Sequence, residues 1–465
     1  MLTKRSLQWS PMLLSMAIFF GCAKQQNTQD SLSPTRTVAK TETAGDGKYD
    51  LLGYGYDATG QFANAASATF PVLDITKLEN ESLSSILLES APSQEYVEDY
   101  GENAYQYSKR ISTKVEATGA YSIFKATISY NYNGADAFNA KYIYGSYNLL
   151  VKQKRVRLNA TKEFLASYLT AGFKSAVQTM TAAQLISNYG THVLVDLYTG
   201  AKMDIMYQAE TNSRNGSSAA SGGVRVAVGS IFNINVATST DVSNASQNYS
   251  RKLIYKTRGG DPSKGLVGQI NLDQNAPQVN FAQWQNSCTP ANSVLIDIAP
   301  KGLIPLYEFI TDANKKAEVM NYITQYLQNN QVNLAYDKVP VYAYYNAGNN
   351  KHIFELDRRL DSDPNWQYRG PYFYAYKQQA PGTVPVYHFY APTTGDNQYS
   401  LSTSNDYNYW NLDGIKWYAY STQQAGTVPI YQFYHFTTGR EHFLGSSPTS
   451  APANEWSKSI LFYAY

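Results

Sequence analysis

Cysteine is almost absent from this sequence, which contains only Cys22 and Cys288 among its 465 residues. A framework of disulfide bonds is therefore excluded as the source of stability, and Cys288 is expected to be a buried apolar thiol. Charge is also sparse, at 16% of residues, and balanced, with 38 Lys and Arg against 36 Asp and Glu. Because a basic excess is missing, nucleic acid is not expected as a partner. The length predicts two or three domains.

Long hydrophobic runs are missing as well, and the apolar run at 11–20 is too short to span a bilayer permanently. Two basic residues precede this run and Cys22 follows it, which is typical of a secretory signal and resembles a bacterial lipoprotein signal. The resemblance implies that residues 1–22 end at a lipidated Cys22, with an ordinary signal peptide as the alternative. Residues 23–48 lack apolar periodicity and predict a disordered tether. The expected location is that of an outer membrane lipoprotein, surface-exposed or released by secretion or in vesicles.

Apolar residues alternate with small or polar ones through Gly222–Thr238. Period two sustained over about 13 residues exceeds the usual strand and suits a transmembrane β-strand, with lipid on one side and water on the other. A soluble antiparallel sheet with one wet face gives the same pattern, and periodicity alone favours it. A second alternating region, Val115–Tyr132, precedes a strand-like segment at 141–158. The apolar positions in question are Val224, Val226, Val228, Phe232, Ile234 and Val236 in the first region, and Phe124 and Ile128 in the second.

Helical spacing is found in three segments, at 157–169, 181–187 and 311–327. In the third segment, Asp312 is expected to cap the N-terminus of the helix. The buried stripe of that helix is expected to consist of Ala317, Met320, Ile323 and Leu327.

The motif NYGTHVLVDLYTGAK at 188–202 places a histidine between a Gly-Thr turn and a run of β-branched residues. Thr191 and His192 could serve as nucleophile and base, but catalysis would also need an orienting acid and an oxyanion site. No second histidine occurs before residue 352, and no motif indicates the paired carboxylates of a glycoside hydrolase. We therefore expect no enzyme, no metal and no cofactor. His192 is expected to be a hydrogen-bonded packing residue at the start of a strand.

The same motif resembles the signature of the membrane-attack-complex/perforin (MACPF) family. The residues that carry the resemblance are Tyr189, Gly190, Thr191 and His192. Three further segments resemble the family and follow in its order: LLGYGYDATGQF at 51–62, YKTRGGDP at 255–262 and PLYEFITDANKKAEVMNYITQYL at 305–327.

The resemblance implies an α+β domain at 49–333, in which a bent four-stranded antiparallel sheet carries two flanking helical clusters. On assembly the clusters, at about 116–140 and 209–247, would unfurl into two membrane-crossing β-hairpins and place the alternating apolar residues against lipid. Gly259 and Gly260 would form a hinge. Because unpaired backbone cannot enter hydrocarbon, hairpins from many subunits must close into one barrel. The implied partners are target membrane lipid and further copies of the chain in a ring.

The remaining segment, 334–465, is built from three repeats that are rich in tyrosine. The repeats open with VPVY, VPVY and VPIY and close with FYAY, WYAY and FYAY, which predicts an all-β, β-trefoil-like module with threefold pseudosymmetry. They resemble a bacterial repeat of secreted proteins that is thought to bind surface ligands. The second repeat has Gln398 in place of the mid-repeat histidine that the other two carry. The candidate glycan-binding residues are Asn350, His352, Asn397, Gln398, Glu441 and His442, whereas the repeated aromatics fit a core.

Together these features predict a pore-forming toxin with a C-terminal module that recognises a surface glycan or lipopolysaccharide. The layout resembles the bacterial lipoprotein branch of the family, the Bacteroidales secreted antimicrobial proteins, and this resemblance implies that bacteria are the target. One alternative is a non-lytic surface adhesin in which the family fold is a rigid stalk and the repeats bind carbohydrate. Another is a glycoside hydrolase with a lectin appendage.

Overall fold

The computed structural model describes residues 47–465 except 116–120, 130, 133–134, 405–408 and 438–440. The expected signal with Cys22, and nearly all of the expected tether, lie outside the described residues. So does part of the first expected hairpin.

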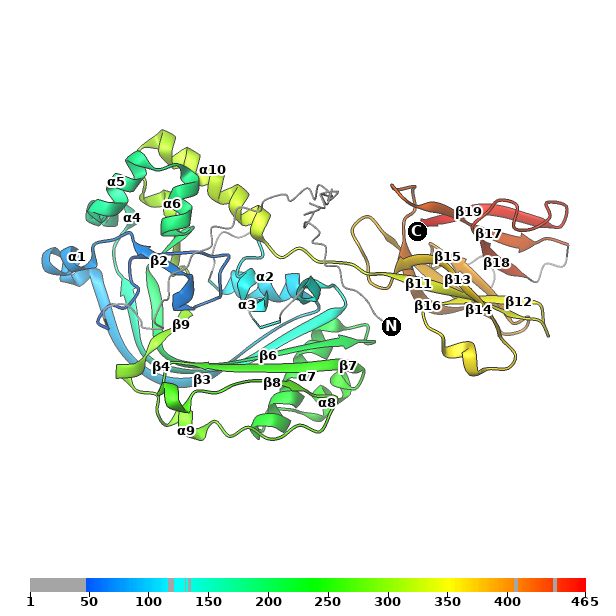
Figure 1. Cartoon of the computed structure of the whole chain (residues 1–465), viewed down its shortest axis with the longest axis horizontal. Helices are drawn as coiled ribbons and strands as arrows, with labels where there is room; N and C mark the ends of the chain where they lie inside the picture. Colours follow the sequence, from blue (N-terminus) through cyan, green and yellow to red (C-terminus); the bar gives the residue numbers. More distant parts are fainter. Residues whose placement is uncertain (1–46, 116–120, 130, 133–134, 405–408, 438–440) are drawn as a thin grey trace, which may run out of the picture. The chain divides into compact units, whose positions relative to one another are not determined.

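Four long antiparallel strands form the centre of the N-terminal domain: β3 (Ile86–Gly101), β4 (Tyr142–Leu158), β6 (Asp196–Thr211) and β7 (Asn248–Arg258). The short strand β8 (Val267–Asn271) extends the sheet in the order β3-β4-β6-β7-β8, and β9 (Val294–Ile298) pairs with one end of β6. Figure 1 shows that the sheet is strongly bent. The predicted bent four-stranded antiparallel sheet is confirmed.

The bend has a local cause in three adjacent strands. The register shifts between Ser90 and Ser93 in β3, and between Lys152 and Lys154 in β4, so each strand bulges at the same level of the sheet. Bulges increase the local twist and bend a strand. At this level β6 contributes Gly200, where a Cβ atom would lie 2.0 Å from the carbonyl oxygen of Val151. Only glycine permits strands β4 and β6 to approach so closely.

A small second sheet lies beside one end of the long strands, in the order β10-β5-β1-β2. Its strands are β1 (Tyr54–Tyr56), β2 (Ala68–Pro71), β5 (His192–Leu194) and β10 (Leu303–Pro305). Helices belonging to this part are α1 (Ile75–Glu81), α4 (Lys162–Leu165), α5 (Ala171–Thr179), α6 (Ala182–Tyr189) and α10 (Ala313–Asn330).

Two sequence predictions in this part need correction. The segment 157–169 begins as the end of strand β4, and only a short α-helix and a 3-10 turn follow. Asp312 caps helix α10 as predicted, by accepting a hydrogen bond from Lys315 N. The buried stripe of α10, however, is Val319, Ile323 and Leu327, whereas Met320 is 40% exposed.

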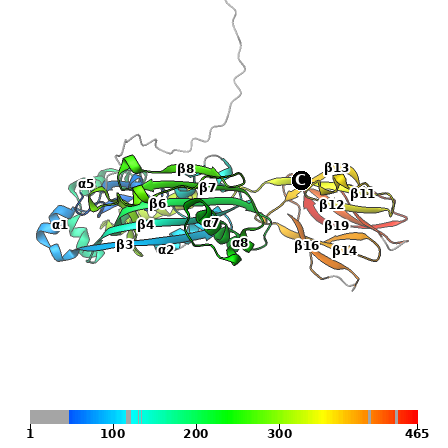
Figure 2. The ribbon, with the colours of Figure 1, turned by 90° about the horizontal axis from the view of Figure 1, so that it is seen from below.

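Two groups of helices lie on opposite faces of the long sheet (Figures 1 and 2). The first consists of α2 (Ala104–Lys114) and α3 (Lys125–Ser129), and the second of α7 (Gly216–Phe232) and α8 (Ser239–Ala245). Each group lies in the chain between two neighbouring strands of the sheet, as the family resemblance implies. A further short helix is α9 (Ala282–Gln285). Within the described residues, no helix is long and apolar enough to cross a membrane.

The C-terminal module is all-β, as predicted, and each repeat forms three antiparallel strands with the first strand in the middle. The strands are β11 (Lys338–Asn346), β12 (Lys351–Glu355), β13 (Gln367–Tyr376), β14 (Val384–Ala391), β15 (Asp396–Ser400), β16 (Asn411–Ala419), β17 (Val428–His435), β18 (His442–Gly445) and β19 (Trp456–Ala464). The first two repeats share a sheet, β12-β11-β13-β16-β14-β15, and the third forms β18-β17-β19.

Threefold pseudosymmetry is visible in the aromatic residues that close the repeats. The rings of Tyr376, Tyr420 and Tyr465 meet in pairs at 6.1, 6.2 and 6.3 Å, each pair nearly perpendicular. The buried core also includes Phe373, Trp417 and Phe462, one from each repeat. The repeated closing motifs therefore build the core of the module, as the sequence indicated.

Candidate functional site

The motif that resembles the MACPF signature, residues 189–192, forms a tightly packed junction between helix α6 and the small sheet. Gly190 ends α6 with a φ of 70°, and a Cβ atom there would lie 2.4 Å from the backbone of Tyr56. Thr191 Oγ1 accepts a hydrogen bond from Ala58 N at 3.0 Å and lies 2.8 Å from Nδ1 of His192. Tyr189 is buried beside this junction. Because Leu306 N also donates a hydrogen bond to the carbonyl oxygen of Thr191 at 2.9 Å, the motif joins three segments that are distant in sequence.

His192 is fully buried at the start of strand β5. Burial lowers the pKa of its imidazole from 6.5 to about 4, so the ring is neutral at physiological pH. Its Nε2 atom has no hydrogen-bond partner among the described residues. A buried neutral ring without an acid beside it packs the sheet and offers substrate no access, which matches the packing role expected from the sequence.

Helix α7 carries half of the residues expected to enter the membrane, and two more follow it directly. Val224, Val228 and Phe232 are buried against the long sheet, whereas Val226, Ile234 and Val236 are half-buried. The period-two pattern thus forms a helix here, which corrects the soluble strand that periodicity alone favoured. The physical reason is that Ala220, Val224, Ala227, Val228 and Ile231 also follow helical spacing and share one face.

The composition of α7 is poor for a helix. Its interior holds three glycines, each about 1 kcal/mol less favourable than alanine, and a run of β-branched residues. The glycines at 222 and 223 permit close contact, since a Cβ at Gly223 would lie 2.6 Å from the ring of Tyr207. Packing against the sheet, rather than helix propensity, therefore holds this segment in its helical form.

An ion-pair cluster fastens α7 to the edge strand of the sheet. Arg225 contacts Glu98 of β3 through Nε at 2.9 Å and Nη2 at 2.8 Å, and it reaches Asp241 of α8 at 3.2 Å. Ser221 Oγ donates a further hydrogen bond to Glu98 at 2.7 Å. Burial alone would raise the pKa of Asp241, but hydrogen bonds from Thr238 and the charge of Arg225 hold it below its usual value.

Asp99, the next residue of β3, forms ion pairs with the first helical cluster. Asp99 points to the opposite face, where it pairs with Lys114 at 2.6 Å and with Arg110 at 3.4 Å, both on α2. Successive residues of a strand face opposite sides. Glu98 and Asp99 therefore hold one helical cluster each. Sequence reasoning missed both acids, because nothing local marks a pairing with Arg225, 127 residues away.

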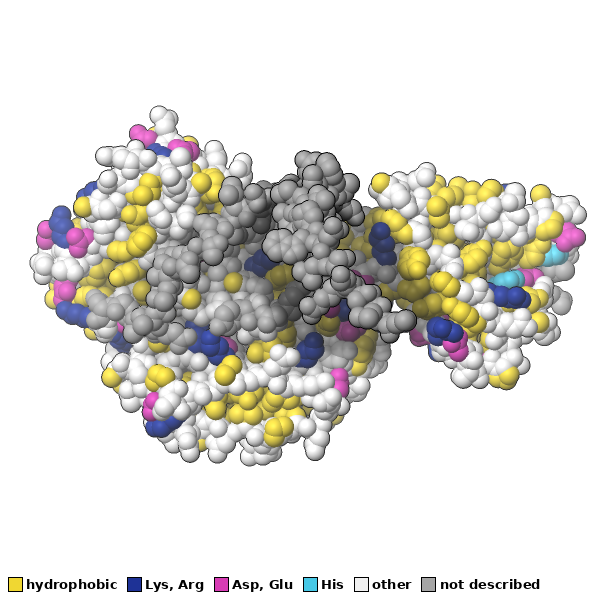
Figure 3. Space-filling view, in the orientation of Figure 1, with side chains coloured by type: hydrophobic (Ala, Val, Ile, Leu, Met, Phe, Trp, Pro, Cys, Tyr) yellow, Lys and Arg dark blue, Asp and Glu magenta, His cyan; other side chains and the backbone are white. Residues whose placement is uncertain are grey.

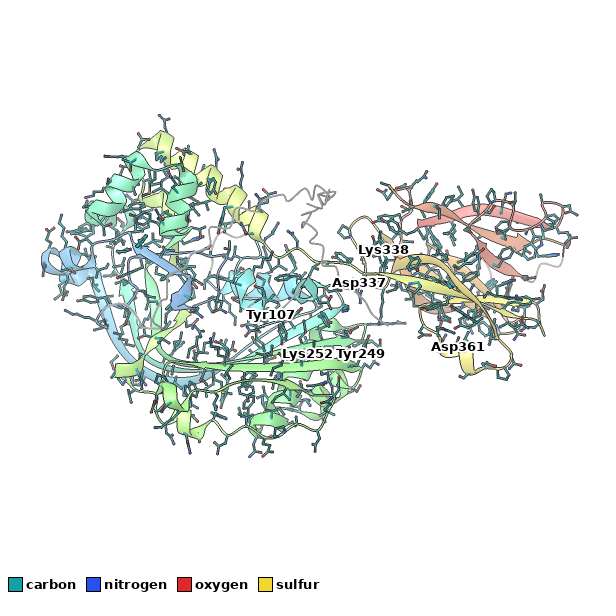
Figure 4. All side chains as sticks on the ribbon, viewed as in Figure 1. Tyr107, Tyr249, Lys252, Asp337, Lys338 and Asp361 are labelled. Carbon is teal, nitrogen blue, oxygen red and sulfur yellow. The ribbon has the colours of Figure 1, made fainter. Side chains whose placement is uncertain are left out.

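Phe124 and Ile128, the expected membrane residues of the first cluster, are fully buried. Phe124 has a φ of 63°, a left-handed conformation that costs a non-glycine residue about 1–3 kcal/mol. Between α2 and the sheet lies a cavity of about 300 Å³, lined by Tyr107, Lys114 and Met206 among others. Figure 4 labels Tyr107 on α2. The first cluster thus combines buried apolar residues with local strain and incomplete packing.

Gly259 and Gly260, the expected hinge, follow strand β7 directly and both have left-handed φ values, 69° and 73°. A Cβ at Gly259 would lie 2.5 Å from the carbonyl oxygen of Gly200. The pair therefore sits at the level where the sheet bends.

The candidate glycan residues are brought together by the C-terminal module, where they join neighbouring repeats. Glu441 accepts a hydrogen bond from Asn350 Nδ2 at 2.6 Å and lies 3.1 Å from Nδ1 of His352. His442 Nδ1 lies 2.7 Å from Asp396. Asn397 is buried between His388 and the backbone of His352. Among the described residues, no group of three metal-ligating side chains is found.

The strand register corrects which residue of the second repeat is equivalent to the histidines of the other two repeats. Tyr345 pairs with His352, Tyr434 with His442 and Tyr390 with Asn397. Asn397, not Gln398, therefore stands where the other repeats have histidine. Gln398 pairs with Phe389, one position further along the strand.

Comparisons with known proteins agree with this architecture. The family model of the MAC/Perforin domain matches residues 43–335, and a domain of unknown function, DUF5648, matches 307–408 and 340–458. No curated protein matches the chain.

Two solved structures share the fold. One is a putative cell invasion protein with a MAC/Perforin domain from Bacteroides thetaiotaomicron, 18% identical, with a TM-score of 0.51 over 78% of this chain and 70% of that chain. The other is GNIP1Aa from Chromobacterium piscinae, 16% identical, with a TM-score of 0.51 over 89% of this chain and 91% of that chain.

Proposed function

Because this chain belongs to the MAC/Perforin family, we propose that it is a pore-forming protein that assembles into a ring on a target membrane and inserts two β-hairpins per subunit. The hairpins derive from the two helical clusters. We further propose that bacteria are the target, that the C-terminal module recognises a surface glycan, and that Cys22 carries a lipid anchor to the outer membrane. A Cys22→Ala variant that stays in the membrane fraction would rule out the anchor.

The observation that carries the proposal is the double periodicity of the α7 segment. In its helical form, residues at helical spacing face the sheet, and in an extended form the alternate residues from Val224 to Val236 are apolar except Ser230. Such a strand could face lipid on one side and water on the other. Low helix propensity and ion pairs to one edge strand support a segment that is stored as a helix and released when its contacts are lost.

A disulfide that forbids extension of this segment tests the proposal directly. A Cβ at Gly229 would lie 4.0 Å from Cβ of Ala237, within the range of disulfide-bonded residues. In an extended strand the same residues are about 27 Å apart. We therefore expect Gly229→Cys/Ala237→Cys, with Cys288→Ser to remove the other thiol, to bind target cells without releasing an entrapped dye. Reductant should restore release.

The matched control is the single variant Gly229→Cys with Cys288→Ser, whose dye release should not respond to oxidant or reductant. If the oxidised double variant releases dye as fast as the reduced one, the segment does not extend and hairpin insertion is wrong. If neither the variants nor the unmodified chain releases dye from any target cell, the protein is better explained as a non-lytic adhesin.

A further inference from the structure

We propose that the seam between the third and the first repeat of the C-terminal module binds one neutral sugar ring, and that the other two seams do not. The proposal rests on the proposed role of this module in target recognition, and it adds the place and chemistry of the site. A seam is defined here by two residues from neighbouring repeats. One repeat contributes Lys351, Asp396 or Glu441, and the following repeat contributes the residue one position further along, which is His352, Asn397 or His442.

The three seams are equivalent in backbone but not in chemistry. The first positions are Lys351, Asp396 and Glu441, all buried, and the second positions are His352, Asn397 and His442. A carboxylate meets a histidine in the third-to-first seam and again in the second-to-third seam. In the first-to-second seam, lysine and asparagine replace them. Only two seams therefore hold a histidine ordered by a buried acid.

In the third-to-first seam a chain of hydrogen bonds orders the histidine. Tyr345 Oη donates to Asn350 Oδ1 at 2.7 Å, and Asn350 Nδ2 donates to one oxygen of Glu441 at 2.6 Å. Nδ1 of His352 lies 3.1 Å from the other oxygen of Glu441. Because the carboxylate engages Nδ1, the tautomer is fixed and Nε2 is left for a ligand. The His352 side chain is 28% exposed, whereas that of Glu441 is 6% exposed.

These groups line an open cavity of about 580 Å³, within the range typical of small-molecule sites. Its other walls include Phe443 and Trp456, and the Phe443 ring lies 5.2 Å from that of His352. In Figure 3, histidine side chains reach the surface of this module beside hydrophobic ones. Aromatic faces next to ordered polar groups suit a sugar ring, which has an apolar face and a rim of hydroxyls.

The charge of the cavity indicates a neutral ligand. Among the described residues of the lining, Glu441 contributes a carboxylate and Arg369 is the one cation, 5.1 Å from the ring of Tyr345. The described lining residues therefore carry no surplus positive charge to attract sialic acid, sulfate or phosphate.

The other two seams are filled by the protein itself. In the second-to-third seam Trp410 packs edge-on against His442, at 5.6 Å between ring centroids, and the His442 side chain is only 13% exposed. In the first-to-second seam, Asn397 is 2% exposed and its amide bonds His388 and the backbone of His352. Among the described residues of these two seams, neither His442 nor Asn397 is as exposed as His352.

Binding of the labelled full chain to an array of sugars tests the inference. The array carries neutral hexosides and N-acetylhexosaminides beside sialylated and sulfated sugars. We expect binding to at least one neutral sugar and none that requires an acidic group. His352→Ala and Glu441→Gln should each weaken it about tenfold or more, because the sugar hydroxyl that Nε2 of His352 binds is then left without an ordered hydrogen-bond partner. The matched control, His442→Ala, should retain binding within about twofold.

His442→Ala breaks the shorter and more buried of the two histidine–carboxylate contacts. A loss caused only by destabilisation would therefore be at least as large in this control, and such a result overturns the proposal. Binding to no neutral sugar, or only to acidic ones, overturns it as well. Dye release from sugar-free vesicles at high protein concentration separates the two hypotheses. Release without sugar binding contradicts this inference alone, and sugar binding without release contradicts the pore alone.

Discussion

At the scale of single residues, His192 illustrates how a catalytic-looking side chain can serve packing alone. Its ring is fully buried, and its one hydrogen-bond partner within the described part of the chain is the adjacent Thr191. The low pKa has a consequence for stability. The unfolded chain takes up a proton as the pH falls through 6.5, whereas the folded chain does so only near pH 4. Stability is therefore present above pH 6.5 and lost as the pH falls toward 4.

We predict that His192→Asn reduces this acid sensitivity. Asparagine retains a polar atom near Thr191 but does not titrate. Between pH 7 and pH 4.5 the free energy of unfolding of the unmodified chain should fall by about 2–3 kcal/mol more than that of the variant. Urea unfolding at both pH values measures the difference, because all other titrating groups are common to the two proteins. Equal losses in both proteins would show that His192 is not buried as a neutral ring.

At the scale of elements, the α7 segment shows what local sequence can and cannot predict. Strand β4 and helix α10 follow from patterns within their own residues, including the cap at Asp312. The period of α7 favoured a strand, and only the family resemblance indicated a stored helical cluster. The helix depends on contacts with β3, β4 and β6, which no local pattern encodes. The same holds for Glu98, whose partner Arg225 lies 127 residues away.

Lysine substitutions at two exposed positions near the end of α7 should affect the inserted form differently while leaving the stored form unchanged. Ser230 and Asn235 are both exposed in the folded chain, so a lysine at either should leave folding intact. In an extended hairpin, Ser230 shares the face of Val228, whereas Asn235 shares the face of Arg225. A lysine on the lipid face costs from about 0–1 kcal/mol near the interfaces to about 2–4 kcal/mol near the midplane, and a ring repeats that cost in every subunit.

We therefore expect Ser230→Lys to abolish dye release and Asn235→Lys to retain most of it, with equal binding to cells. Val228 is unsuitable for this test because it is fully buried, and a lysine there would destabilise the folded chain. Equal dye release by the two lysine variants would mean that alternate residues of this segment do not face lipid and water.

At the scale of the whole molecule, the two folded parts have separate cores. The N-terminal clusters of buried residues contain nothing beyond Leu334, and the core of the repeats begins at Val341. The parallel bridge between Asn139 and Ala335 ties the end of the first part to its body. Asp337 and Lys338, labelled in Figure 4, mark the junction, and β11 begins at Lys338. A chain that ends at Asp337 should therefore fold without the repeats.

This division assigns pore formation and recognition to different parts, and truncation separates them. A chain ending at Asp337 retains the Ala335 bridge and both helical clusters. It should therefore unfold cooperatively and still release dye from vesicles at high concentration. Its binding to sensitive cells should fall at least tenfold, because the recognition module is missing. Cell binding by pull-down and dye release from the same cells measure the two properties separately. If the truncated protein binds and kills cells as well as the full chain does, the repeats have no role in recognition.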